Sequence, residues 1–295
     1  MALREYILEE IAFDYRDALI TRREALRRLG LLGLGISTAA AFLAACGGGG
    51  GGDGEKAGDK TPATSAPPAT AAAVTEDITF AGPNGDLFGA WAEAPEPKGA
   101  VLVIHEIFGL TDHIKTIPPR FAADGYSALA IDLVSEEGGT AAVGEDVVGA
   151  LGGASDDRLV ADLRAGLDEL ERREPDTKLG VIGFCFGGGI TWRLLAAGEP
   201  RLAAAAPFYG PTPDNADFSG SEAAVVAVYG ELDTRVHEGR EPAEAALQAA
   251  GLTYEVTTYP GADHGFFNET SARYNAEAAT AAYDDVLAWF DEHLA

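Results

Sequence analysis

Cysteine and positive charge are the two things that this 295-residue chain has little of. Its two cysteines, Cys46 and Cys185, lie in very different contexts, so neither a disulfide framework nor a cysteine-rich metal site is available. It has 21 Lys and Arg against 47 Asp and Glu, a net charge of −26. Because phosphate binding needs clustered basic side chains, this balance argues against nucleic acid as a partner.

A long apolar run is also missing. The most apolar stretch, Leu29–Ala45, includes several Gly, Ala, Ser and Thr, whereas a membrane-spanning helix needs about 20 strongly apolar residues. A twin arginine, Arg22-Arg23, precedes this stretch, and "LAAC" ends it at Cys46. We therefore expect residues 1–45 to be an export signal of the twin-arginine type with a lipoprotein box. An uncleaved anchor helix is the alternative.

If the signal is cleaved, Cys46 becomes the lipidated first residue. The mature protein would then lie outside the cytoplasm and touch the membrane only through this N-terminal anchor. Residues 46–74 are Gly-rich and then Ala-, Pro- and Thr-rich, which predicts a flexible tether. Residues 75–295 are long enough for one α/β domain.

Within this domain, short apolar runs alternate with helical patterns. The run "GAVLVIHE" at residues 99–106 is typical of a strand buried on both faces of a parallel sheet. Leucines recur at helical spacing over 156–173, and the last segment, 275–294, has one apolar face. The fold class predicted is α/β, with a mostly parallel, doubly wound sheet flanked by helices. Further strands are expected at 126–132, 178–184, 203–209, 223–229 and 253–259, and "ITF" and "LFGAW" indicate a hairpin near the start.

The catalytic residues are expected in the turns that follow these strands. The segment "GFCFGG" has the frame of G-x-S-x-G, the sharp strand-to-helix turn of a hydrolytic nucleophile, with Cys185 in place of serine. Asp233 follows the strand at 223–229 and His264 follows the strand at 253–259, which gives the order nucleophile, acid, histidine. His264 would then move the proton of the thiol while Asp233 holds its ring.

Two backbone N–H groups complete this hypothesis. The N–H of Phe186, just after the nucleophile, and that of Ile107, after the first long strand, are expected to form the oxyanion hole. Taken singly, each motif has a simpler interpretation, since a lone buried cysteine is usually inert. His105 is interpreted as a support for its loop. The other three histidines, His113, His237 and His293, are interpreted as surface residues.

At this point the residues resemble a known family. "HEIFGL", "GFCFGG", "FYG", "GELD" and "GADHGF" are similar to the motifs of dienelactone hydrolases, and the resemblance covers most of residues 75–295. It implies an α/β-hydrolase fold, no metal or organic cofactor, and hydrolysis of an ester or lactone, of the carboxymethylenebutenolide type, through a thioester. It also implies that Glu106 partners the resting thiol and helps to activate it. We further expect Phe108, Tyr209 and Asn268 to contact the substrate.

The sequence departs from this family at the substrate's carboxylate. Members that act on dienelactone bind it with two arginines, and here one of these positions is Asn268 and the other segment, after "IDL", has none. Arg158 and Arg273 are possible substitutes. The partner expected is a small ester or lactone. The sequence does not determine the oligomeric state, although a monomer is favoured. A broad carboxylesterase and a non-catalytic, surface-anchored binding protein on the same fold stay open as alternatives.

Overall fold

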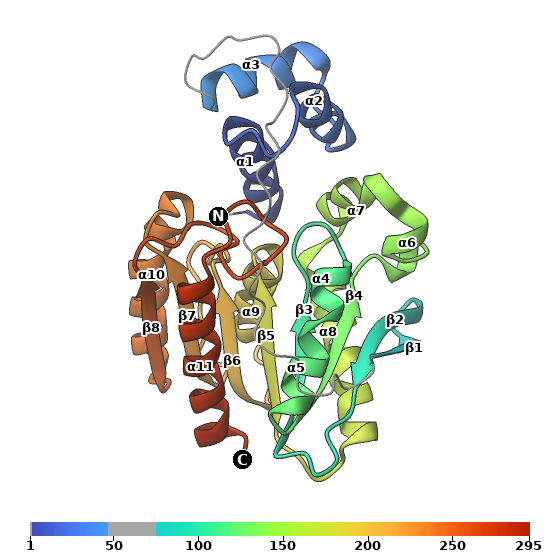
Figure 1. Cartoon of the computed structure of the whole chain (residues 1–295), viewed down its shortest axis with the longest axis vertical. Coiled ribbons are helices and arrows are strands. Elements are labelled where there is room, and N and C mark those ends of the chain that lie inside the picture. Colours follow the sequence, from blue (N-terminus) through green and yellow to red (C-terminus); the bar gives the residue numbers. More distant parts are fainter. Residues whose placement is uncertain (1, 47–74) are drawn as a thin grey trace.

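The computed structural model of the chain describes residues 2–46 and 75–295 (Figure 1). The predicted tether covers residues 46–74, and of these the structure describes only the backbone of Cys46. Residues 75–295 form a sheet domain. Residues 3–46 form three helices, here called the N-terminal helices, which stand on one end of the sheet (Figure 1).

The sheet has eight strands in the order β1-β2-β4-β3-β5-β6-β7-β8. β1 pairs with β2 and β2 with β4 in antiparallel fashion, and the other pairs are parallel. The bounds are β1 (Glu76–Gly82), β2 (Gly85–Ala92), β3 (Gly99–Ile104), β4 (Tyr126–Asp132), β5 (Leu179–Phe184), β6 (Leu202–Phe208), β7 (Ala224–Gly230) and β8 (Tyr254–Tyr259).

The central strands are buried along their whole length. Every residue of β3, β4, β5 and β7 is buried, as their nearly continuous apolar sequences predict for a parallel sheet covered on both faces. The first hairpin is also present, as β1 and β2. The predicted fold class is confirmed: this is the α/β-hydrolase arrangement of a mostly parallel sheet between helices.

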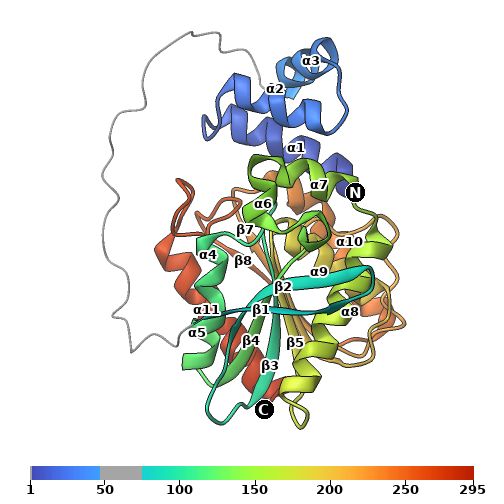
Figure 2. The ribbon, with the colours of Figure 1, turned by 90° about the vertical axis from the view of Figure 1, so that its right-hand side faces the viewer.

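Helices cover both faces of the sheet. α5 and α11 lie on one face and α8 and α9 on the other (Figures 1 and 2). The leucine stripe of α8 is fully buried, which confirms the helix expected at 156–173. The helices are α4 (Asp112–Lys115), α5 (Ile117–Ala123), α6 (Thr140–Val143), α7 (Val147–Gly153), α8 (Asp156–Arg173), α9 (Phe186–Ala196), α10 (Thr234–Ala250) and α11 (Ala276–His293), with 3-10 turns at Ser135–Glu137 and Gly144–Asp146.

The N-terminal helices are α1 (Leu3–Arg16), α2 (Arg22–Leu31) and α3 (Ile36–Cys46). The apolar run Leu29–Ala45 does not form one helix, because α2 ends within it and Gly33 takes a left-handed backbone conformation, with φ +82°, before α3 begins. The run is therefore divided between two helices in this structure, while cleavage and the alternative of an uncleaved anchor both stay predictions. No helix in the described ranges combines the length and apolar character that crossing a membrane requires.

α1 is the helix nearest to the sheet. It contacts α7 and α9 of the sheet domain, and Figure 1 shows it above the carboxyl ends of the central strands. In a doubly wound sheet this is the edge where ligands bind. The N-terminal helices thus cover the edge where the sequence places the chemistry.

Candidate active site

Cys185 lies on a sharp turn between β5 and α9. Its backbone has φ +56° and ψ −115°, a strained conformation for a residue with a side chain. The turn needs glycine on both sides, because a Cβ on Gly183 would lie 2.1 Å from the carbonyl oxygen of Gly187, and one on Gly187 would lie 2.4 Å from that of Ile104. These contacts explain the G-x-C-x-G pattern and match the strained elbow that presents a nucleophile.

His264 and Asp233 form a close pair beside this turn. His264 lies in the loop after β8 and Asp233 directly after β7, and Nδ1 of the histidine is 2.5 Å from Oδ2 of the aspartate. Burial acts to raise the pKa of Asp233, but His264 and Arg235 together outweigh burial and hold this pKa below the usual value. The ionised carboxylate therefore accepts the Nδ1 proton and leaves Nε2 directed away from it. The structure brings together the three residues that the sequence order selected.

Glu106 and Asn268 form a second polar pair. The Nδ2 group of Asn268 donates a hydrogen bond of 2.7 Å to Oε2 of Glu106, and burial raises the pKa of this glutamate. The thiol of Cys185 instead has the hydroxyl of Tyr6 as its hydrogen-bonding neighbour, at 3.1 Å. In this arrangement Asn268 therefore orients Glu106.

The two residues predicted to supply the oxyanion hole lie after β5 and after β3, and their role as donors stays a prediction. Phe186 is the first residue of α9, and the first amides of a helix have no acceptor within it. Ile107 is buried in the loop that follows β3. His105 supports this loop as predicted, since Nδ1 lies 2.6 Å from the carbonyl oxygen of Glu106 and Nε2 accepts the N–H of Leu133 at 3.1 Å.

The predicted substrate contacts differ in exposure. Tyr209 is fully buried and packs edge-on against the ring of His264, with the ring centroids 5.1 Å apart. Phe108 is 38% exposed and lies under the guanidinium of Arg28, 5.0 Å from its ring centroid. Tyr209 thus forms a wall behind the histidine, while Phe108 lies at the rim beside α2.

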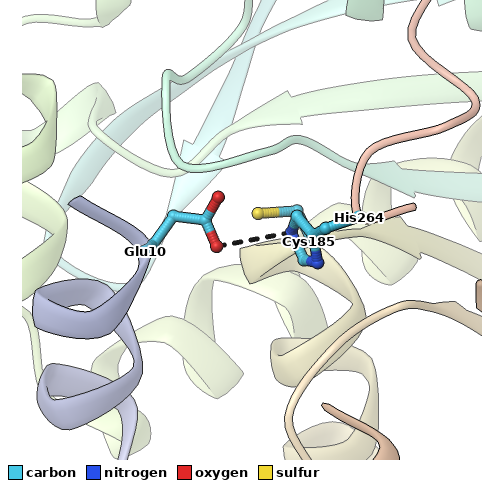
Figure 3. A group of neighbouring side chains, drawn as sticks. All are labelled: Glu10, Cys185 and His264. Carbon is cyan, nitrogen blue, oxygen red and sulfur yellow. Dashed lines mark ion pairs between the residues drawn. The ribbon is translucent and has the colours of Figure 1, made fainter. Parts of the chain in front are cut away.

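Residues of α1 reach the centre of this site. The Tyr6 hydroxyl lies 3.1 Å from Sγ of Cys185 and 3.2 Å from Nε2 of His264. Oε2 of Glu10 lies 3.4 Å from the same Nε2 (Figure 3). Both side chains are buried, at 1% and 3% exposure. The sequence interpretation missed them because it assigned residues 1–45 to an export signal.

Two arginines surround the carboxylate of Glu10. Arg235, the second residue of α10, hydrogen-bonds to Oε2 of Glu10, and Nη1 of Arg273 lies 4.0 Å from Oε1. Arg273 also pairs with Asp14 at 3.2 Å and with Asp17 at 2.6 Å. Arg273 is one of the two substitutes named from the sequence. Arg235 was missed, although it comes two residues after the predicted acid.

Arg158, the other substitute, lies elsewhere. It pairs with Glu137 at 2.7 Å, with Glu136 at 3.3 Å and with the buried Asp162 at 3.4 Å, so its charge is already paired beside the 3-10 turn. The interpretation of His113 as a surface residue is wrong: its side chain is buried, and Nδ1 lies 2.9 Å from Glu269. His237 and His293 are half-buried.

The charges in the site oppose the reactive form of the cysteine. Burial raises the pKa of the Cys185 thiol, and the negative charge of Glu10 raises it further. Burial acts to lower the pKa of His264, but the charges of Glu10 and Asp233 outweigh it, so this pKa lies well above its usual value. The resting pair is a neutral thiol beside an imidazolium.

Three side chains in the site could together bind a metal ion. Glu10, Cys185 and His264 each offer a ligand atom within 4.8 Å of the others, and zinc accepts all three types. The guanidinium of Arg235 already pairs with Glu10, however, and its positive charge opposes a cation there. That no metal takes part stays a prediction.

Comparison with known proteins assigns the chain to a family. Residues 88–294 match the model described as the dienelactone hydrolase family. This chain belongs to the dienelactone hydrolase family. The match begins within β2, so the N-terminal helices lie outside the residues that define this family.

Relatives support the same assignment. A protein of Escherichia coli O157:H7 described as a "Putative carboxymethylenebutenolidase" is 31% identical over 240 residues, which cover 75% of this chain and 88% of that protein. One of the same description from Synechocystis is 32% identical, with 74% and 96% covered. A crystal structure titled as a "Putative Dienelactone Hydrolase" of Klebsiella pneumoniae has a TM-score of 0.66 at 28% identity, with 75% and 99% covered.

Proposed function

We propose that this dienelactone hydrolase family member hydrolyses a small ester or lactone with Cys185 as the nucleophile and a thioester as the intermediate. The observation that carries the proposal is the strained turn that holds Cys185 beside the pair of His264 and Asp233. A buried structural cysteine needs neither a strained backbone nor a histidine held by an ionised carboxylate. The alternative of a non-catalytic binding protein gives these features no role.

The reaction follows from the geometry in two halves. Nε2 of a neutral His264 takes the thiol proton as Sγ attacks the carbonyl carbon, and the N–H groups of Ile107 and Phe186 stabilise the oxyanion. The C–O bond of the substrate then breaks, and His264 returns the proton to the alkoxide that leaves. Water attacks the thioester with His264 as base, which releases the acid and restores the thiol.

Glu106 has a supporting part in this proposal. It is buried next to the site, and its charge raises the pKa of the thiol, so it is close enough to influence the sulfur. When substrate enters and the hydrogen bond from Asn268 shifts, the carboxylate of Glu106 would be free to act as a second acceptor for the thiol proton besides His264.

The arginines favour a substrate with a carboxylate. Arg235 and Arg273 already hold the carboxylate of Glu10 next to His264, which is where the acid group of a carboxylated lactone would lie. A broad carboxylesterase would prefer neutral esters. Comparing kcat/KM for a carboxylated lactone with that for a neutral ester of equal size decides between these two substrate classes.

The mechanism is tested by trapping the intermediate. With the enzyme in excess over an activated ester, a single acyl group should appear on Cys185, located by peptide mass spectrometry. The Cys46→Ser variant, which keeps the proposed nucleophile, serves as the control and should acylate equally. An acyl group on Cys46 alone, or turnover that survives Cys185→Ala, would exclude the mechanism.

Export is also part of the proposal. The twin arginine, the short apolar run and "LAAC" favour cleavage before Cys46 and lipidation of that cysteine. The N-terminal sequence and mass of the protein extracted from membranes of cells that express it test this directly. An intact Met1 in the membrane-bound protein would rule the cleavage out.

A further inference from the structure

Helix α1 presents one row of buried side chains to the catalytic centre. Tyr6 and Glu10 are four residues apart and Asp14 follows after four more, so all three lie on one face of the helix. Each of them contacts a residue of the sheet domain through a polar atom: Tyr6 contacts Cys185, Glu10 contacts Arg235, and Asp14 contacts Arg273. Ile7 and Ile11 lie beside this row and are fully buried or nearly so.

Tyr6 takes the space that a substrate needs. A carbonyl carbon that is to be attacked must come to roughly 3–3.5 Å from the nucleophile. The Tyr6 hydroxyl is already 3.1 Å from Sγ, and Cys185 is only 4% exposed. An ester cannot reach the sulfur while α1 stays in place.

Tyr6 and Glu10 also engage the base. Nε2 of His264, the atom that must accept the thiol proton, lies 3.2 Å from the Tyr6 hydroxyl and 3.4 Å from the carboxylate of Glu10. Asp233 pairs with the other ring nitrogen, Nδ1. Both nitrogens of the imidazole are therefore engaged, Nδ1 by a carboxylate and Nε2 by a hydroxyl and a carboxylate. The charge of Glu10 keeps the ring protonated, and a protonated ring cannot act as a base.

The arginines bind Glu10 as they would bind an acid ligand. Arg235 is buried and pairs with Glu10, while Arg273 lies beside the same carboxylate and extends to Asp14 and Asp17. Within the sheet domain Arg235 pairs with Asp233 at 3.6 Å, and its guanidinium can bind a second anion at the same time. α1 supplies it from within the chain.

We propose that α1 is an intramolecular inhibitor that occupies the substrate site, with Tyr6 on the nucleophile and Glu10 at the arginines. The inhibitor rests on the proposed function, since it blocks the cysteine that performs the reaction. The full chain is then a latent enzyme, and it becomes active when α1 leaves. Cleavage before Cys46, the processing expected from the sequence, would remove all three N-terminal helices and free the site.

The test uses the full-length chain with Glu10→Arg. This change places a third positive charge against Arg235 and Arg273 and should expel α1. The matched control is Glu5→Arg, the same charge change at an exposed position of the same helix. Two quantities are measured: the rate at which iodoacetamide alkylates Cys185, followed by peptide mass spectrometry to separate it from Cys46, and the turnover of p-nitrophenyl acetate.

Both rates should rise at least tenfold in Glu10→Arg and change less than twofold in Glu5→Arg. An unchanged alkylation rate in a folded Glu10→Arg variant overturns the proposal that α1 is an inhibitor. So does turnover that falls below that of the wild type, because α1 would then be a working wall of the pocket. Faster alkylation with no turnover of p-nitrophenyl acetate or of a carboxylated lactone in any variant shows that α1 covers Cys185 and refutes the proposed hydrolase.

A second variant covers the case in which Glu10→Arg does not fold. Tyr6→Ala opens the space beside Sγ without adding a charge, and it should raise both rates at least fivefold. Circular dichroism and thermal melting establish that it is folded. Rates equal to those of the wild type in this variant count against the inhibitor as strongly as the first result.

Discussion

The sheet domain and the N-terminal helices are held in place by different forces. β3 and β5 are buried on both faces by aliphatic side chains, so the position of Cys185 at the end of β5 is set by the core itself. α1 adds apolar contacts through Ile7 and Ile11, but its innermost groups are charged or polar, and they meet charged partners. Hydrophobic burial is insensitive to pH and ligands, whereas ion pairs are sensitive to both. The difference suits a permanent site with a removable cover.

Removing the nucleophile tests whether the sheet domain alone carries the chemistry. In the Glu10→Arg background, Cys185→Ala should lower kcat/KM by roughly 10⁴-fold or more, as for other nucleophiles of catalytic triads. The measurement is initial-rate kinetics with p-nitrophenyl acetate. Cys46→Ser in the same background should be indistinguishable from its parent. Substantial activity without Cys185 would exclude this cysteine as the nucleophile of the sheet domain.

Removing Arg235 should separate the two regions. Its loss leaves the carboxylate of Glu10 buried without its closest partner, and breaking a buried pair in this way costs about 3–5 kcal/mol. We expect Arg235→Ala to release α1, seen as faster hydrogen exchange over residues 3–16 while β5 stays protected. Arg23→Ala, at an exposed position of α2, is the control and should leave the exchange of α1 unchanged.

Apolar truncations should show which region determines global stability. Leu102→Ala, at a fully buried position of β3, is expected to lower the free energy of unfolding by about 2–5 kcal/mol in urea titrations. Ile7→Ala, at a fully buried position of α1, should instead expose Cys185 to alkylation while the midpoint of the main unfolding transition stays nearly constant. A loss of global stability as large as that of Leu102→Ala would show that α1 belongs to the cooperative core.

Docking of α1 should weaken as the pH rises. Burial, followed by the charge of Glu10, raises the pKa of Asp14 from 3.8 to about 7, against the opposing effects of Arg273, His264 and Arg235. The docked helix therefore binds a proton that the released helix gives up, so docking is strongest near pH 4 and is progressively lost up to about pH 7. The raised pKa of His264 acts in the same direction. The lowered pKa of Glu10 acts in the opposite direction, but only at lower pH.

Asp14→Asn is the variant that isolates this effect. Its amide is neutral at every pH, so the ratio of the wild-type alkylation rate of Cys185 to that of Asp14→Asn cancels the intrinsic pH dependence of the thiol. This ratio should be near one at about pH 4, should rise several-fold by about pH 7 and should then level off. A ratio that stays flat would remove Asp14 from the account of docking.

Much of the fold could be predicted from local pattern. The helix at 156–173 and the strand at 126–132 have the predicted bounds, because leucines at helical spacing and an unbroken apolar run are strong local signals. The positions of Cys185, Asp233 and His264 followed from the same reasoning, since parallel strands bring their carboxyl ends to one edge. The burial of His113 was not predictable, because it depends on Glu269, which lies far along the chain.

By itself, the sequence determined the sheet, the strained turn at Cys185 and the order of the residues that can act on an ester. Only the tertiary structure decided that Tyr6 lies against Cys185, 179 residues away, and Glu10 against Arg235, 225 residues away. The physical reason is that strand order and turn geometry follow from periodicity and glycine placement, which are local. The docking of a helix depends instead on whether two separate surfaces match in shape and charge, and that match exists only after both have folded.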